Sequence, residues 1–136
     1  RMLKGKSMML TLKVKTEKDI AIANPKKIVL LPYFLRRMVR KGTNYVEDSF
    51  SAECKDAVLK IKPFLITRRK VSRAVRKALR NKAREELINY VKDKPLYELF
   101  DEIIKNQIQK QLSLKLKKIY PLALCEIRVL ESKDKI

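Results

Sequence analysis

Residues 58–91 read VLKIKPFLITRRKVSRAVRKALRNKAREELINYV, and this one segment holds both a strand pattern and the longest helix pattern of the chain. Val58 to Thr67 predicts a strand, in which Pro63 is typical of an edge position or a β-bulge. Lys70 to Val91 predicts a helix, because apolar residues recur at three- and four-residue steps. The expected core stripe of this helix consists of Val71, Val75, Ala78, Leu79, Leu87, Ile88 and Val91. We therefore expect a sheet with a long helix packed on it.

The chain before this segment alternates in the manner of β-strands. Met8 to Lys15 predicts a half-buried strand, because apolar and polar residues alternate there with a period of two. Ile20 to Ala23 predicts a short second strand that stops at an Asn24-Pro25 turn. The inward side chains expected on the first strand are Leu10, Leu12 and Val14.

A short helix and a hairpin are expected next. Pro32 suits the first turn of a helix over Tyr33 to Lys41, and Gly42 is expected to end it. Tyr45 to Cys54 predicts a strand that returns through a tight connection at Lys55–Ala57 into residue 58. The expected inward face of this strand consists of Val46, Phe50, Ala52 and Cys54.

Two more helices and a strand are expected after residue 91. Pro95 opens a helix whose inward residues are Leu96, Leu99, Phe100, Ile103 and Ile104. Gln107 to Ile119 is ambiguous because its leucines alternate, although its Lys- and Gln-rich composition favours a helix. Ala123 to Glu131 alternates and predicts a final strand. The order of elements predicts a single α+β domain over residues 1–136, with a mostly antiparallel sheet and one or two helices beside the long one.

Composition restricts the classes of function. The 136 residues contain 34 Lys and Arg against 15 Asp and Glu, a net charge of +19, while 46% of residues are hydrophobic. This combination describes a folded, strongly cationic domain. Histidine is absent, and Cys54 and Cys125 cannot form a zinc site alone and are expected to be free, buried, cytosolic thiols. We expect no catalytic residue, cofactor or metal, and no membrane association.

The positive charge is concentrated, which predicts RNA as the partner. On the long helix, cations recur at three- and four-residue steps on the side opposite the core stripe. A solvated face and an anionic membrane surface are the alternatives. The expected RNA-binding residues are Arg36, Arg37, Arg40, Lys41, Arg68, Arg69, Lys70, Arg73, Arg76, Lys77, Arg80 and Arg84.

The aromatic and acidic residues are not expected to be the main RNA-binding groups. Tyr33, Phe34 and Tyr45 lie near the first cationic cluster, where they could stack on bases, but core packing is the favoured interpretation. The acidic stretch from Glu85 to Ile104 is expected to face solvent or a basic protein rather than RNA. Its members include Glu85, Glu86, Glu98, Asp101 and Glu102.

The order of several motifs resembles a known family. These are LPYFLRRMVRK at 31–41, PFLITRR at 63–69 with the basic helix behind it, KKIYPL at 117–122 and EIR at 126–128. Together they resemble the small-subunit ribosomal proteins of archaea and eukaryotes called e-S-one, or S-three-A-e, over roughly Met8 to Val129. Members normally carry a longer basic N-terminus, so a chain that begins at Arg1 is expected to lack that segment. The family usually has Asp-Gly where this chain has Asp56-Ala57.

The resemblance implies a structural, non-enzymatic protein on the platform of the small ribosomal subunit, near the messenger exit and the 3′ end of the ribosomal RNA. It implies neighbouring platform proteins as partners, with messenger RNA and, in eukaryotes, initiation factors. It also implies a cytoplasmic location on the ribosome, with nucleolar assembly in a eukaryote. The residues alone leave two alternatives, a free RNA-binding regulator of translation or RNA processing and an RNA-processing enzyme.

Overall fold

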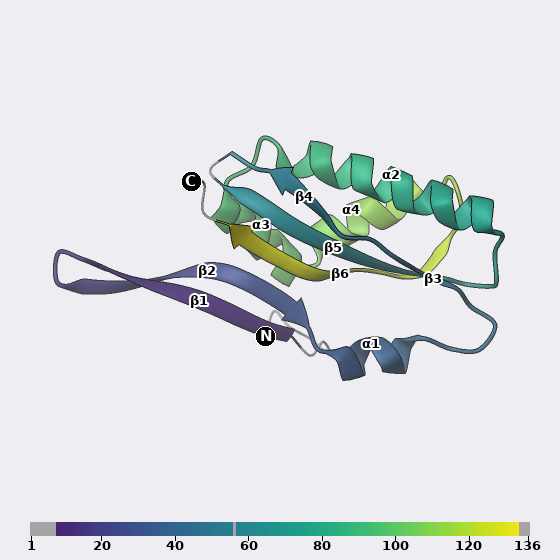
Figure 1. The fold of residues 1–136 in the computed structure, drawn as a ribbon, viewed down its shortest axis with the longest axis horizontal. Coiled ribbons are helices and arrows are strands. Elements are labelled where there is room, and N and C mark those ends of the chain that lie inside the picture. The colour runs from purple at the N-terminus through teal and green to yellow at the C-terminus, as the bar shows by residue number, and fades with distance from the viewer. Residues whose placement is uncertain (1–7, 56, 134–136) are drawn as a thin grey trace.

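The computed structural model describes residues 8–55 and 57–133. Ten elements follow one another in this part of the chain (Figure 1). They are β1 (Met8–Glu17), β2 (Ile20–Leu30), α1 (Pro32–Met38), β3 (Tyr45–Glu47), β4 (Phe50–Glu53), β5 (Val58–Thr67), α2 (Arg73–Val91), α3 (Leu96–Ile104), α4 (Gln107–Leu116) and β6 (Leu122–Lys133).

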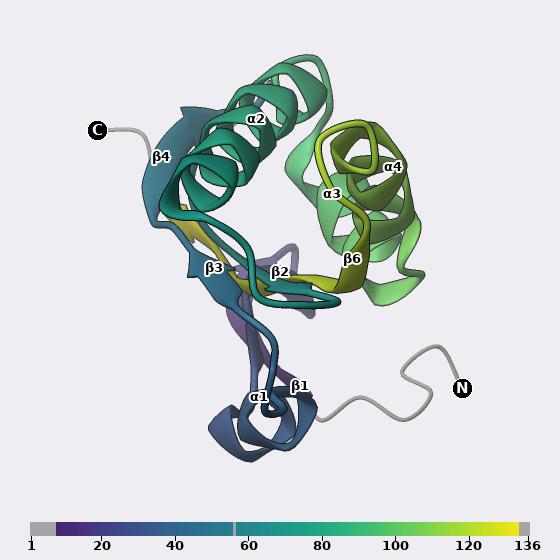
Figure 2. The same ribbon diagram turned by 90° about the vertical axis from the view of Figure 1, so that its right-hand side faces the viewer.

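A single antiparallel sheet forms the middle layer. Its strand order is β1-β2-β6-β5-β3, and β4 also pairs with β5. α2, α3 and α4 cover one face of the sheet, and α1 lies on the other (Figure 2). This arrangement confirms the predicted α+β class.

The central strand β5 contributes to both faces. Leu59, Ile61 and Leu65 pack under the helices in the larger core, whereas Phe64 and Ile66 pack against α1 in the smaller one. The predicted irregularity at Pro63 is a bulge rather than an edge, because the pairing with β6 shifts between Lys62 and Pro63.

The long helix begins later than expected, at Arg73 rather than Lys70. Ser72 caps it by accepting the backbone N–H of Val75 at 3.3 Å, which satisfies one of the unpaired donors of the first turn. Its buried residues are Leu79, Ala83, Leu87 and Val91. Ala78 and Ile88, predicted for the core stripe, are exposed, because a row with four-residue steps faces the sheet and these two lie beside it.

The N-terminal hairpin differs most from expectation. β2 does not stop at Asn24-Pro25 but continues to Leu30, and Pro25 is accommodated where the β1–β2 pairing shifts between Thr11 and Leu12. The turn is made by Lys18 and Asp19, both with positive φ. The predicted half-burial of β1 is wrong, because this two-stranded ribbon extends beyond the helices (Figure 1). Its Leu10, Leu12 and Val14 are exposed.

The remaining elements are close to the predicted ones. α1 ends at Met38, before Gly42, which lies in the following turn with φ +81°. The strand expected over Tyr45 to Cys54 is divided into β3 and β4, and Val46, Ala52 and Cys54 are buried as predicted. The ambiguous segment is the helix α4, which ends at Leu116. Asp56 lies outside the described residues.

Candidate nucleic-acid interface

The loop between β5 and α2 is held by two polar side chains that the sequence analysis did not single out. The buried hydroxyl of Thr67 accepts the backbone N–H of Asn44 at 3.0 Å and donates to the carbonyl of Arg69 at 2.7 Å. The side-chain oxygen of Asn44 accepts the backbone N–H of Val71 at 2.8 Å. These bonds tie the loop to the residue preceding β3. The exposed side chains of Arg68, Arg69 and Lys70 therefore project from a fixed backbone.

α2 extends this cationic surface along the edge of the sheet. Arg73, Arg76 and Arg80 line a hollow of about 230 Å³ together with Tyr45, Val46 and Glu47. The Nε of Arg76 is buried and has no hydrogen-bond partner among the described residues. Three arginines around one hollow give it a positive potential that favours an anion such as a phosphate. Arg68, Arg69, Lys70, Arg73, Arg76, Lys77 and Arg80 are called the α2 strip below.

Arg84, also predicted to bind RNA, is engaged within the protein. Its Nε and Nη2 donate to the two carboxylate oxygens of Asp48 at 3.0 and 2.8 Å, and its guanidinium lies 5.4 Å from the centre of the Phe50 ring. The hydrogen bond to Asp48 raises the pKa of Arg84 above its ordinary value. Arg84 therefore already has a carboxylate partner and is not counted in the α2 strip.

The other predicted cations lie on the opposite face of the sheet. Arg36, Arg37, Arg40 and Lys41 are exposed on α1 and just after it, and are called the α1 cluster below. α1 lies on the other side of the sheet from α2 (Figure 2). Tyr45 and Glu47 of β3 line hollows on both sides, one with Arg36 and the other with Arg73, Arg76 and Arg80. The cations predicted to bind RNA therefore form two surfaces that approach each other at β3.

A second hollow lies on the α1 side of β3. It measures about 470 Å³ and is lined by Pro32, Leu35, Arg36, Val39, Tyr45, Glu47, Phe64 and Arg128. The ring of Tyr45 stacks on that of Phe64, with 5.9 Å between centres and 16° between planes. Core packing, the interpretation favoured for the three aromatic residues, is confirmed for buried Phe34 and wrong for Tyr33 and Tyr45, which are exposed.

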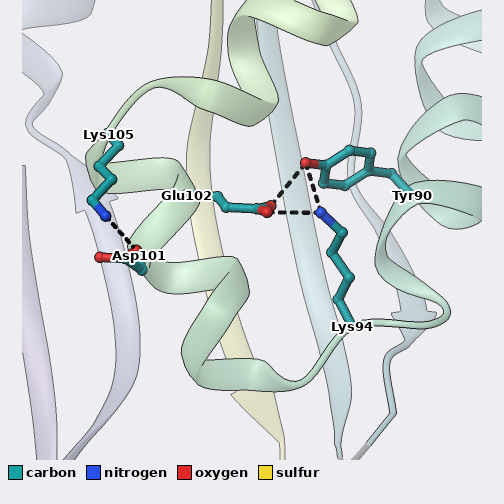
Figure 3. A network of polar contacts seen from close by, with 5 residues as sticks. All are labelled: Tyr90, Lys94, Asp101, Glu102 and Lys105. Carbon is teal, nitrogen blue, oxygen red and sulfur yellow. Dashed lines mark hydrogen bonds and ion pairs between the residues drawn. The ribbon is translucent and has the colours of Figure 1, made fainter.

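More side chains of the acidic stretch have partners within the protein than expected. Glu102 is only 8% exposed, so its predicted position facing solvent or a partner is wrong. It accepts hydrogen bonds from the Tyr90 hydroxyl at 2.8 Å and from Lys94 Nζ at 2.7 Å (Figure 3). Asp101 is exposed and pairs with Lys105, and Glu86 accepts both Lys82 and Lys115. Successive residues of a helix point in different directions, so Glu102 faces α2 whereas Asp101 points away from it (Figure 3).

Glu102 is expected to stabilise the contact between α2 and α3. Burial opposes the charge of Lys94, but its hydrogen bonds to Glu102 and Tyr90 outweigh this effect and raise its pKa to about 12. Glu102→Leu should lower the free energy of unfolding by about 2 to 3 kcal/mol, because it leaves a partly buried ammonium without a carboxylate partner. Lys94→Met in the same chain should recover most of this loss, as urea denaturation at neutral pH would measure.

The pH dependence of this contact follows from the same shift. The pKa of Lys94 is 10.5 in the unfolded chain and is raised to about 12 in the folded chain. The contact therefore stabilises the fold fully below pH 10.5, and this stabilisation is lost as the pH rises through about 12. The stability difference between the wild type and Lys94→Met should shrink over this range. A constant difference would contradict the assigned contact.

None of the helices described is long and apolar enough to cross a membrane. Within residues 8–55 and 57–133, no group of three or more His, Cys, Asp or Glu side chains could hold a metal ion.

Comparison with known proteins assigns the chain to a family. The model of the Ribosomal S3Ae family matches residues 6–134. The chain belongs to this family. The resemblance inferred from 31–41, 63–69 and the C-terminal motifs is thereby confirmed.

Two relatives within the family carry the name "Small ribosomal subunit protein eS1". The protein of Nanoarchaeum equitans is 30% identical over 124 residues, which cover 89% of this chain and 63% of that protein. The protein of Pyrobaculum neutrophilum is 27% identical over 95 residues, which cover 69% of this chain and 43% of that protein. The chain thus spans less than two thirds of the length of either relative.

Proposed function

We propose that this chain is a structural, non-catalytic component of the small ribosomal subunit that binds small-subunit ribosomal RNA. The α2 strip carries the proposal. It places seven cations on one helix and on a loop fixed by hydrogen bonds, and none of the seven forms an ion pair with a carboxylate of the described residues. Membership in the S3Ae family supports the same assignment. The finer location, on the platform near the messenger exit, is proposed from the family resemblance.

Contacts to phosphate and sugar are expected to dominate. Ribosomal RNA is largely A-form helix, whose narrow major groove hides the base edges from side chains. Arginine suits this task because its planar guanidinium can donate two parallel hydrogen bonds to phosphate oxygens. Neighbouring platform proteins are proposed as further partners, with messenger RNA and, in eukaryotes, initiation factors. The proposed location is the cytoplasmic ribosome, preceded in a eukaryote by nucleolar assembly.

The proposal predicts strong salt dependence. Each phosphate neutralised contributes a slope of about −0.7 to −0.9 to the log–log plot of affinity against salt. Full use of the seven cations of the strip would therefore give a slope of about −5 to −6. Filter binding to small-subunit ribosomal RNA between about 50 and 200 mM salt measures it. A slope close to zero would contradict phosphate binding by the strip.

The alternative is a free RNA-binding regulator of translation or RNA processing. A ribosomal protein should sediment with small subunits at near one copy each, whereas a regulator should appear in a ribosome-free pool. A sucrose gradient of cell extract, probed for this chain, distinguishes the two. Confinement to the light fractions would favour the regulator, and nuclease or transferase turnover by the purified chain would favour an RNA-processing enzyme.

A further inference from the structure

We propose that the hollow between α1 and β3 binds one unpaired nucleotide of RNA, with its base stacked on Tyr45. The inference rests on the proposed function, because it assumes that the chain binds RNA. It adds a second mode of recognition beside the phosphate contacts of the α2 strip.

The lining of this hollow has the chemistry of a base-binding site. The apolar side chains of Leu35, Val39 and Phe64 line it. The charged side chains of Arg36, Glu47 and Arg128 line it as well. Its volume of about 470 Å³ lies within the range of roughly 300 to 1,000 Å³ that is usual for sites of small organic ligands. Such a hollow can accept a single flat ring, but it cannot accept a base that remains paired and stacked in a duplex.

Tyr45 provides a stacking platform that is already in place. Its ring is stacked on Phe64, yet 56% of the residue remains exposed. Because the side chain is held by this stack, little conformational freedom is lost when a ligand joins it. Bases that are splayed out of RNA helices commonly stack on aromatic side chains in this way.

The charges around Tyr45 favour a nucleotide over an uncharged apolar ligand. Arg36 lies at the hollow itself, and Arg73, Arg76 and Arg80 lie around the neighbouring hollow that Tyr45 also lines. A strand of RNA that places a base beside Tyr45 therefore has arginines for the phosphates on both sides of β3.

Glu47 is the one carboxylate in both linings. It would repel a phosphate, but it is held only loosely by Arg128, with 3.5 Å between Nη1 and Oε1. A carboxylate accepts hydrogen bonds and cannot donate them. Glu47 is therefore suited to accept hydrogen bonds from the N–H groups of a base edge. The phosphates would be bound by Arg36 on one side and by the arginines of α2 on the other.

The test compares Tyr45→Leu with Tyr45→Phe in the full chain. The probes are a single-stranded RNA oligonucleotide containing 2-aminopurine and an RNA duplex of equal charge. Leucine keeps apolar volume but removes the ring, so affinity for the single strand should fall about tenfold, in line with the usual strength of base–aromatic stacking. Phenylalanine should retain the affinity. Quenching of 2-aminopurine should occur with the wild type and Tyr45→Phe and be absent with Tyr45→Leu, while duplex affinity stays unchanged in all three.

The outcomes separate this inference from the proposed function. If Tyr45→Leu keeps the single-strand affinity and the quenching of the wild type, the inference is wrong. The proposed function still stands in that case if charge reversal in the α2 strip abolishes duplex binding. Failure of that charge reversal to weaken either RNA overturns the proposed function. If an uncharged apolar peptide abolishes the quenching while Tyr45→Leu leaves RNA affinity unchanged, this pair of results would assign the hollow to a protein partner and overturn the inference. Should Tyr45→Leu melt earlier than the wild type, the three proteins are compared at a temperature at which all of them remain folded, with the same expected losses of single-strand affinity and of quenching.

Discussion

A chain carrying Arg69→Glu, Arg73→Glu and Arg80→Glu should bind small-subunit ribosomal RNA at least about a hundredfold more weakly than the wild type. Each substitution replaces an attraction to phosphate by a repulsion, and a single hydrogen bond to a charged group contributes about 1.5 to 3 kcal/mol. All three side chains are exposed, so the fold should persist. Arg76 is left unchanged because its buried Nε makes a carboxylate there a risk to stability. Filter binding at fixed salt and incorporation into small subunits measure the effect.

The matched control changes Lys55, Lys92 and Lys110 to Glu. These lysines are exposed and the change in net charge is the same. Lys92 follows the last residue of α2, a 19-residue helix whose length of about 28 Å separates it from Arg73. Lys55 is near that far end, because its backbone N–H donates to the carbonyl of Lys94. Equal losses of RNA affinity in both triple variants would mean that only the net charge matters. Normal RNA binding by the variant of the α2 strip would mean that the strip is a solvated face without a role in binding.

Phe100→Ala should have the largest effect on stability, lowering the free energy of unfolding by about 3 to 5 kcal/mol. Phe100 is only 1% exposed and packs from α3 into the core beneath the helices. Truncation removes buried apolar surface and leaves a cavity that close-packed neighbours fill only in part. Because domains are usually stable by about 5 to 15 kcal/mol, this is a large share of the total. Urea denaturation followed by circular dichroism measures it.

Tyr97→Ala provides the control on the same helix. Tyr97 is 70% exposed, so its truncation should change stability by less than about 0.5 kcal/mol. Similar losses in the two variants would mean that α3 is destabilised by truncation in general. A negligible loss in Phe100→Ala would contradict the assigned core.

The strands and helices of the main body follow from periodicity in the sequence. β5 matches its predicted range, and its apolar residues pack into cores on both faces of the sheet. α3 forms as predicted because its apolar residues recur at helical steps. The cationic loop and α2 were also predicted, since a local run of arginines and lysines on one helix needs no tertiary information. Family membership was predictable for the same reason, because it rests on the order of short motifs.

The tertiary structure alone decided which polar and aromatic side chains have partners. Asn44 and Thr67 are 23 residues apart, and Arg84 and Asp48 are 36 apart, so no local pattern indicates either contact. The burial of Glu102 and the exposure of Tyr45 likewise depend on which neighbour lies opposite. Local propensity and periodicity act over a few residues, whereas pairing and burial are set by elements that folding brings together from distant parts of the chain.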